Sequence, residues 1–137
     1  MTESTCLFCQ IISKKIPSKR IYEDDICIGI LDIFPVSKGH SLIIPRMHYN
    51  TIEDIPENVL KHLIIVVKEL GGKIHKKLNV DGYNILQNNF LAAGQAINHF
   101  HIHIIPRLKN DSKFKLKIPK IQVDDNQLEN IRAKILN

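Results

Sequence analysis

Three histidines in the last third of the 137-residue chain, His99, His101 and His103, alternate with apolar residues within 98–107. Side chains alternate between the two faces of a β-strand, so the histidines would share one face. Imidazole titrates near neutral pH and serves as a base, a nucleophile, a hydrogen-bond donor to phosphate or a metal ligand. Three interpretations follow: half-exposed polar side chains, a strip of ligands for zinc, copper or nickel, or a phosphate-handling site, which the neighbouring residues favour.

A second group of residues that could bind a metal or carry out chemistry is the Cys-x-x-Cys motif formed by Cys6 and Cys9. Such a motif can supply two of the four ligands of a tetrahedral zinc ion, and two more ligands must then come from elsewhere. A redox-active dithiol is an alternative, but that motif normally follows a strand of a βαβ unit, and no strand can precede Cys6. A pair of free thiols is the third interpretation.

Length and composition indicate one globular domain, with 44% hydrophobic and 24% charged residues. The net charge of +5 and the pI of about 9.2 would suit an anionic partner. Much of the positive excess, however, lies in lysines between Lys109 and Lys120, and the chain has no tryptophan and only 6% aromatic residues. Because nucleic-acid-binding folds usually combine basic residues with stacking aromatics, no specific nucleic-acid partner is expected.

The sequence also bears on the compartment. The first residues lack a charged segment followed by an apolar one, so no signal peptide is predicted. The longest apolar runs, such as 63–67, are too short to span a bilayer, and no membrane association is expected. An odd number of cysteines, three, argues against a secreted disulfide scaffold. A cytoplasmic location is therefore expected.

Five strands are predicted from apolar and β-branched runs bounded by turn residues. The first two form a hairpin around Asp24 and Asp25, Pro45 ends the third, and Asp81-Gly82 precedes the fourth. The strands are predicted at 20–23, 26–31, 41–44, 83–87 and around the three alternating histidines.

One long amphipathic helix separates the third and fourth strands, because apolar residues recur at helical spacing from Leu60 to Leu78. Asp54, Pro56 and Glu57 are predicted to mark its start, with Glu57 as a capping-type acid three residues after Asp54. Two adjacent glycines inside it, Gly71 and Gly72, predict a bend or a close packing contact.

Short helices are predicted near both ends of the chain: a turn at 7–14, and a segment that Asp125 or Asn126 would cap. Two further histidines, His62 and His75, lie on the long helix and are predicted to face solvent. The apolar residues of the C-terminal segment are Leu128, Ile131, Ile135 and Leu136.

This order of elements favours an α+β fold, in which an antiparallel sheet of about five strands packs with one long helix and short terminal helices. Residues 1–110 would form the domain. Residues 111–137 would form a lysine-rich C-terminal extension packed on or near it.

The residues around the histidines resemble the histidine triad (HIT) family of small nucleotide-binding hydrolases and transferases. The family signature, His-apolar-His-apolar-His-apolar-apolar, fits 99–105 throughout. The resemblance covers about 6–110, is nearest to the Hint-like branch and its bacterial relatives, and implies the HIT fold and a homodimer joined through the sheet and the long helix. Further matching residues are Asp32, Gly39, His40, Ile43, Ile44, Pro45, His48 and Asn88.

The resemblance implies nucleotidyl transfer through a covalent intermediate. His101 would attack the α-phosphorus and expel the leaving group, and water would then release the nucleoside monophosphate. His103 would donate a hydrogen bond to a phosphate oxygen, His40 would orient the triad, and Gln95 would assist the leaving group or the phosphate. This chemistry needs no cofactor.

The resemblance also implies a nucleotide site. Asp32 would bind the ribose hydroxyls, and Asn88 would contact phosphate or ribose. Backbone amides around Gly94 and Ala96 would face the phosphate, where glycine allows a close approach. An apolar slot would hold a purine base, although each of its residues could equally be plain core. The slot residues are Leu7, Phe8, Ile11, Ile16, Ile30 and Ile33.

A zinc site is implied in the same way. Many bacterial relatives use two cysteines and two histidines, and the matching residues here are Cys6, Cys9, His48 and His99. The resemblance therefore implies a structural zinc ion with four protein ligands and no open coordination position.

Two departures bear on the substrate. Ala96 stands where Hint-like members often carry a serine that assists the leaving group. The Gly94-Gln95-Ala96 stretch and Pro106-Arg107 are similar to the diadenosine polyphosphate hydrolase branch. The expected function is hydrolysis or nucleotidyl transfer at the α-phosphate of adenosine phosphoramidates or related AMP conjugates. The expected enzyme class is therefore a nucleoside phosphoramidase or nucleotide hydrolase of the HIT family. The alternatives are diadenosine tetraphosphate hydrolysis, a nucleotide-sensing or partner-binding module with little turnover, and zinc storage or metal sensing.

Overall fold

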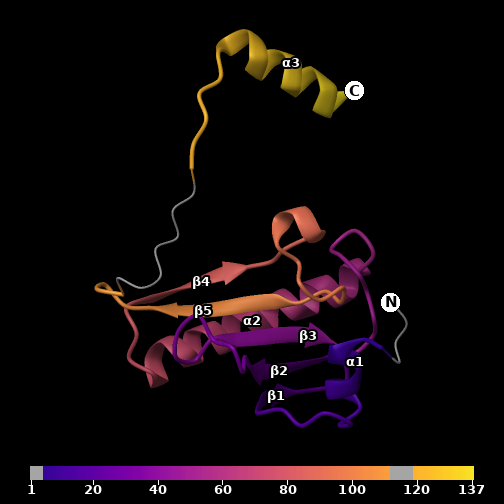
Figure 1. The fold of residues 1–137 in the computed structure, drawn as a ribbon, viewed down its shortest axis with the longest axis vertical. Coiled ribbons are helices and arrows are strands. Elements are labelled where there is room, and N and C mark those ends of the chain that lie inside the picture. The colour runs from indigo at the N-terminus through magenta and orange to yellow at the C-terminus, as the bar shows by residue number, and fades with distance from the viewer. Residues whose placement is uncertain (1–4, 112–118) are drawn as a thin grey trace.

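The computed structural model describes residues 5–111 and 119–137. Its five strands form one antiparallel sheet in the order β1-β2-β3-β5-β4, with α2 packed across one face and α1 on the other (Figure 1). This confirms the predicted α+β architecture. In chain order the elements are α1 (Leu7–Ile12), β1 (Arg20–Glu23), β2 (Cys27–Leu31), β3 (Ser41–Pro45), α2 (Glu57–Lys77), β4 (Gly82–Leu86), a 3-10 turn (Leu91–Ala93), β5 (Ile102–Arg107) and α3 (Asp125–Leu136).

The core lies on both faces of the sheet, because successive side chains of a strand point in opposite directions. Ile43 of β3 belongs to the cluster that α2 covers with Leu63 and Val67. Its neighbour Ile44 belongs to the cluster that α1 covers with Phe8. Both faces of β3 are therefore buried, which explains why its sequence is apolar without alternation.

The histidine segment is only partly a strand. β5 begins at Ile102, so the prediction of one strand carrying all three histidines holds for His103 and is wrong for His99 and His101. Pairing between β3 and β5 stops at Ile102, and the His99 carbonyl beyond it accepts a hydrogen bond from the His101 ring instead of from a strand. Ile102 and Ile104 pack toward α2, which leaves His103 on the α1 side of the sheet.

The β1–β2 hairpin turns at Asp24, whose Oδ1 accepts from the backbone N–H groups of Ile26 and Cys27 at 2.7 and 2.8 Å. Its Oδ2 lies 2.6 Å from Nε2 of His62 on α2. The prediction that His62 faces solvent holds in part, because its side chain is 34% exposed while this carboxylate ties it to the hairpin. His75 is exposed, as predicted.

Pro56 and Glu57 mark the start of α2 as predicted, but Asp54 does not cap α2, and neither Asp125 nor Asn126 caps α3. α2 starts at Glu57 with Pro56 in the capping position, whereas Asp54 accepts from the Thr51 N–H in the preceding turn at 3.2 Å. Asp124, and not Asp125 or Asn126, caps α3, because only Asp124 lies three residues before Gln127 and forms a reciprocal capping box with it.

The C-terminal extension ends in α3, which stands apart from the sheet (Figure 1). None of the twelve residues of α3 is buried. Residues 112–118, which hold much of the lysine-rich stretch, lie outside the described residues, and the packing of the extension on or near the domain stays a prediction. No helix within the described ranges is long and apolar enough to cross a membrane.

The two glycines of α2 have different surroundings. A Cβ on Gly71 would come within 2.7 Å of the Tyr83 ring on β4, whereas a Cβ on Gly72 would meet nothing within 4 Å. The predicted close packing is thus confirmed at Gly71.

We expect Gly72→Ala to raise the free energy of unfolding by roughly 0.5–1 kcal/mol through helix propensity, and Gly71→Ala to lower it by about 1–3 kcal/mol through overpacking. Urea unfolding measures both, and changes of the same sign would contradict this packing.

Candidate active site and metal centre

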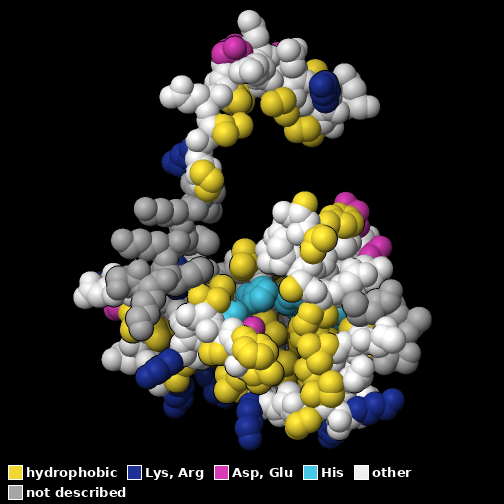
Figure 2. Space-filling view, in the orientation of Figure 1, with side chains coloured by type: hydrophobic (Ala, Val, Ile, Leu, Met, Phe, Trp, Pro, Cys, Tyr) yellow, Lys and Arg dark blue, Asp and Glu magenta, His cyan; other side chains and the backbone are white. Residues whose placement is uncertain are grey.

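Two of the three alternating histidines line a cavity of about 290 Å³ on the α1 side of the sheet. His101 and His103 line its end together with Asp32, which follows β2. Figure 2 shows the histidines in a hollow surrounded by hydrophobic side chains. The remaining lining residues are Leu7, Phe8, Ile11, Ile16, Pro17, Ser18, Ile30, Leu31, Ile33, Phe34, Leu42, Ala96 and Ile97.

His101 is buried, and its hydrogen bond fixes which nitrogen carries the proton. Nδ1 lies 2.8 Å from the carbonyl oxygen of His99, which can only accept, so Nδ1 donates. In the neutral ring Nε2 then keeps its lone pair. Burial lowers the pKa of His101 below the ordinary histidine value, although Asp32 acts in the opposite direction. The arrangement gives a neutral imidazole with a nucleophilic Nε2 at neutral pH.

His40 and His103 form a directed pair. The Val36 N–H donates to Nδ1 of His40 at 3.1 Å, so the neutral His40 carries its proton on Nε2. That Nε2 lies 2.8 Å from Nδ1 of His103 and donates to it, which leaves the His103 proton on Nε2. Burial lowers the pKa of both rings, that of His103 to about 4. His103 is thereby prepared to donate a hydrogen bond, with Asp32 Oδ2 3.7 Å from His40 Nε2 as the nearby negative charge.

The structure brings together every residue predicted for the apolar slot, since all six line the cavity. Phe8 and Ile30 are buried at its base, whereas Ile33 is exposed at its mouth. Phe34 lines the same mouth and was missed from the sequence, although its place two residues after Asp32 was a usable signal. Asp32 itself is held in place because its Oδ1 accepts from the Phe34 N–H at 2.8 Å.

The residues predicted in the loop before the triad mostly lie outside the cavity lining. Gly94 has a positive φ of 89°, and Asn88 Nδ2 donates to its carbonyl at 3.4 Å. Gly94 and Asn88 are not among the residues that line the cavity, whereas Ala96 is. The side chain of Gln95 is buried, its Oε1 accepting from the Phe90 N–H and its Nε2 donating to the Asn50 carbonyl. Both ends of this amide are thus engaged in holding the loop.

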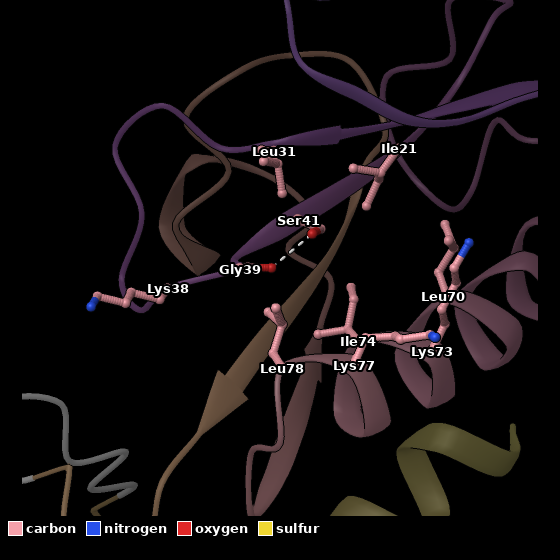
Figure 3. A pocket seen from close by; sticks show the side chains of 10 residues that line it. All are labelled: Ile21, Leu31, Lys38, Gly39, Ser41, Leu70, Lys73, Ile74, Lys77 and Leu78. Carbon is pink, nitrogen blue, oxygen red and sulfur yellow. Dashed lines mark hydrogen bonds between the residues drawn. The ribbon is translucent and has the colours of Figure 1, made fainter.

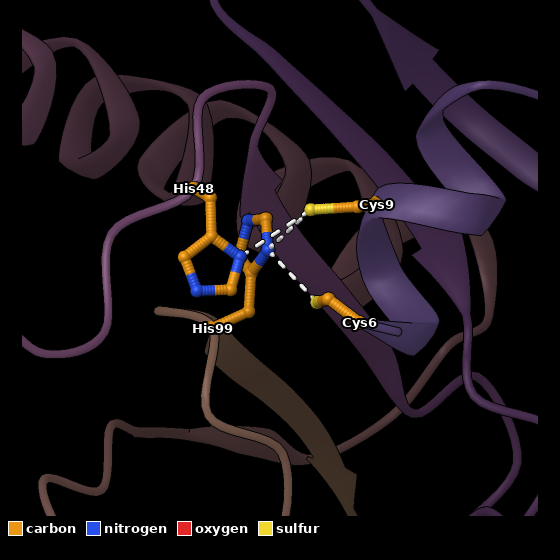
Figure 4. Close-up of side chains that lie close together, drawn as sticks. All are labelled: Cys6, Cys9, His48 and His99. Carbon is orange, nitrogen blue, oxygen red and sulfur yellow. Dashed lines mark hydrogen bonds between the residues drawn. The ribbon is translucent and has the colours of Figure 1, made fainter. Parts of the chain in front are cut away.

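Four potential metal ligands meet at the start of α1, with their donor atoms all within 4.8 Å of one another (Figure 4). Cys6 Sγ lies 3.4 Å from Nδ1 of His99, and Cys9 Sγ lies 3.3 Å from Nδ1 of His48. They are the four residues that the sequence predicts.

The surroundings of the two histidines suit a metal ion. His99 donates from Nε2 to the Pro45 carbonyl at 2.9 Å, and His48 donates from Nε2 to Oδ1 of Asn50 at 3.0 Å. Each Nδ1 therefore keeps its lone pair toward the cysteines, as second-shell partners of metal-bound histidines normally ensure. Burial lowers the pKa of His99 to about 4, which keeps the ring neutral. Two sulfur and two nitrogen donors fit tetrahedral zinc.

A larger cavity, of about 510 Å³, lies on the opposite face between the sheet and the C-terminal half of α2 (Figure 3). Its walls are apolar, with lysines as their charged groups. Because no histidine, cysteine or carboxylate is among the described residues that line it, the nucleophilic chemistry is assigned to the smaller cavity. The larger one is lined by Ile21, Leu31, Lys38, Gly39, Ser41, Leu70, Lys73, Ile74, Lys77 and Leu78.

Comparison with known proteins identifies the family. A sequence model of the HIT domain matches residues 13–110, and the chain therefore belongs to the HIT family. An adenosine 5'-monophosphoramidase of Saccharomyces cerevisiae is 34% identical over 134 residues, which cover 98% of this chain and 82% of the yeast protein. The chain is thus of the hydrolase or nucleotidyl-transferase kind.

Two crystal structures extend the likeness to the whole fold. A HIT family protein from Bacillus anthracis superposes with a TM-score of 0.89 at 35% identity, covering 98% of this chain and 97% of that one. A zinc-bound histidine triad family protein from Mycobacterium smegmatis has a TM-score of 0.78 at 32% identity, with the same coverage of 98% and 97%.

Proposed function

We propose that the protein hydrolyses adenosine phosphoramidates or related AMP conjugates at the α-phosphate, with His101 as the nucleophile. The observation that carries this proposal is the hydrogen bond from His101 Nδ1 to the His99 carbonyl, which leaves the lone pair on Nε2 of a ring that lines the cavity. The name of the yeast relative, an adenosine 5'-monophosphoramidase, supports the same substrate class.

In the first step, Nε2 of His101 forms a bond to the α-phosphorus and the bond to the leaving group breaks. An amine leaves after taking a proton from solvent. The adenylylated ring keeps its Nδ1 proton and gains a positive charge, which the His99 carbonyl and the nearby Asp32 stabilise. His103 Nε2 donates to a phosphate oxygen as charge develops there.

In the second step, water attacks the phosphorus and gives up one proton to solvent, while His101 departs as a neutral ring with the electron pair of the P–N bond, releasing AMP. Imidazole suits both steps because it is a competent nucleophile and leaving group near neutral pH. Asp32 would bind the ribose, and the apolar slot lined by Phe8, Ile11 and Ile30 would hold the base.

Diadenosine tetraphosphate is the second candidate substrate, and one observation favours it. Ala96 contributes to the cavity wall and has no hydroxyl group to protonate an amine. A polyphosphate leaves as an anion and needs less help from a proton donor.

AMP release from adenosine 5'-monophosphoramidate and from diadenosine tetraphosphate, measured side by side by chromatography, tests the proposal. We expect the higher kcat/KM with the phosphoramidate. A preference for the dinucleotide would reassign the substrate to the second candidate. Binding of AMP without cleavage of either compound would favour a nucleotide-sensing module and overturn the hydrolase proposal for these substrates.

The pH dependence of kcat/KM follows from the neutral state of His101. The nucleophile must be unprotonated, and burial lowers the pKa of His101, so the ring stays active below the ordinary histidine pKa. We expect kcat/KM to stay level as the pH falls through about 6.5, the ordinary value, and to decline only at lower pH. Because kcat/KM reports the free enzyme, a half-loss of activity at or above that value would contradict the assignment.

We propose two accompanying features. The first is a structural zinc ion held by Cys6, Cys9, His48 and His99. The second is a homodimer joined through the sheet and α2, supported by β4 as an edge strand and by exposed Ile64 and Ile65 on α2. Light scattering tests the dimer, and a mass of one 15.7 kDa chain at micromolar concentration would refute it.

A further inference from the structure

The loop 90–95, which leads into the cavity wall at Ala96, adopts an unfavourable backbone conformation. Phe90 has φ 70° and ψ 159°, a region that residues with a side chain seldom occupy. Gln95 holds it there with two hydrogen bonds: its Oε1 accepts from the Phe90 N–H at 2.8 Å, and its own N–H donates to the Phe90 carbonyl at 3.2 Å. Because Gln95 is buried, water competes poorly for these bonds.

The other end of the Gln95 amide leads to the metal ligands. Its Nε2 donates to the Asn50 carbonyl at 2.6 Å, and Oδ1 of Asn50 accepts from Nε2 of His48 at 3.0 Å. Nδ1 of the same His48 ring lies 3.3 Å from Cys9 Sγ. A continuous series of hydrogen bonds therefore runs from the candidate zinc ligand His48, through Asn50 and Gln95, to Phe90.

A metal ion bound by His48 would fix the orientation of its ring, and with it the position of Asn50. Second-shell partners of a ligand and the metal constrain one another in this way. Without the metal, the His48 ring is held on the thiol side by weaker contacts, the 3.3 Å contact of its Nδ1 with Cys9 Sγ and an edge contact with the His99 ring. The loop that Gln95 closes then has a less rigid anchor, and Ala96 at the cavity wall follows that loop directly.

We propose that Asn50 and Gln95 are positioning residues that couple metal binding at the zinc centre to nucleotide binding, so that each ligand increases the affinity for the other. This inference depends on the proposed function and zinc site. Thermodynamic linkage requires the effect to be reciprocal and of equal size in both directions.

Four variants separate the parts of this coupling. Asn50→Ala removes the acceptor for His48 and keeps the backbone bond to Gln95, whereas Asn50→Asp keeps an acceptor. Gln95→Glu can still accept from Phe90 but cannot donate to Asn50. The control is Asn89→Ala, because Asn89 Oδ1 accepts from the Ile52 N–H at 2.8 Å and so joins the same two loops without contacting His48.

The first measurement is calorimetric titration of AMP into zinc-loaded and metal-free protein, with zinc affinity determined by chelator competition with and without AMP. We expect zinc to raise AMP affinity at least about fivefold, within the range of ordinary couplings, with an equal factor for AMP on zinc. This coupling factor, the ratio of AMP affinities with and without zinc, should fall below about twofold in Asn50→Ala and Gln95→Glu. It should keep its wild-type value in Asn50→Asp and Asn89→Ala. An undiminished factor in Asn50→Ala would overturn the inference.

The second measurement uses only zinc-loaded protein, and therefore remains decisive if the metal-free form does not fold. Hydrogen exchange at the Phe90 amide should be at least about tenfold faster in Gln95→Glu and Asn50→Ala than in wild type and Asn50→Asp. Equal exchange in all four proteins would refute the coupling. If AMP does not bind at all, the proposed function fails, while the exchange rates still decide whether the metal centre positions the loop.

Discussion

Replacing His101 with alanine should reduce AMP release by at least about 10⁴-fold, the scale on which the loss of a catalytic nucleophile is felt. No other histidine can take its place. His103 Nδ1 accepts from His40, and its remaining nitrogen carries the proton, while His99 is directed at the cysteines. The variant therefore loses the group proposed to form the covalent bond to the α-phosphorus.

The same variant should still bind AMP, because the slot around Phe8 and the carboxylate of Asp32 are untouched. His75→Ala is a suitable control, since His75 is exposed on α2. Steady-state release of AMP and calorimetric binding of AMP would be measured for wild type and both variants. Activity of His101→Ala within tenfold of wild type would show that another nucleophile acts.

Loss of the metal should be the largest effect on stability. The four ligands come from α1 and the residue before it, from the segment after β3 and from the segment before β5, so a bound zinc ion would join parts of the chain as distant as Cys6 and His99. Zinc at a thousandfold excess over its dissociation constant adds about 4 kcal/mol to the free energy of unfolding. For a domain of this size, that corresponds to a rise in Tm of about 10–20 °C.

We expect Cys6→Ser to bind no zinc at stoichiometric concentration and to melt at least about 10 °C below zinc-loaded wild type. Chelation should lower the Tm of wild type to a similar extent and leave that of Cys6→Ser unchanged. Cys27→Ser is the matched control: Cys27 is also fully buried but lies beside Asp24, so this variant should lose stability while keeping one zinc per chain. Equal zinc content in wild type and Cys6→Ser would refute the site.

Local sequence patterns were sufficient for much of this molecule. The apolar periodicity of the long helix and the turn residues around Asp24 predicted the architecture, and the alternation in 99–105 singled out the three histidines. The other residues predicted for the site came from the family resemblance. The slot residues Phe8 and Ile30 were also predicted, through the family resemblance. Such features can be recognised because periodicity and turn chemistry depend on neighbours within a few residues of the chain.

The helix caps show the limit of such reasoning. Several residues near a helix start can serve as the cap, and the choice depends on which backbone groups are free. Asp54 was predicted to mark the start of α2 but bonds in the preceding turn, and Asp124 took the role predicted for Asp125 or Asn126. The sequence identifies the residue types that cap helices, while the local backbone conformation determines which of them does so.

Tertiary structure alone decided the protonation of the histidines and the role of Gln95. His101 is directed by a neighbouring carbonyl, His40 by the Val36 N–H, and Gln95 by Asn50, a residue 45 positions away. The sequence determined that an array of imidazoles and a pair of thiols would exist. Which nitrogen keeps a lone pair depends on the hydrogen-bond partner that the folded chain places beside it, and that partner cannot be deduced from the spacing of the histidines.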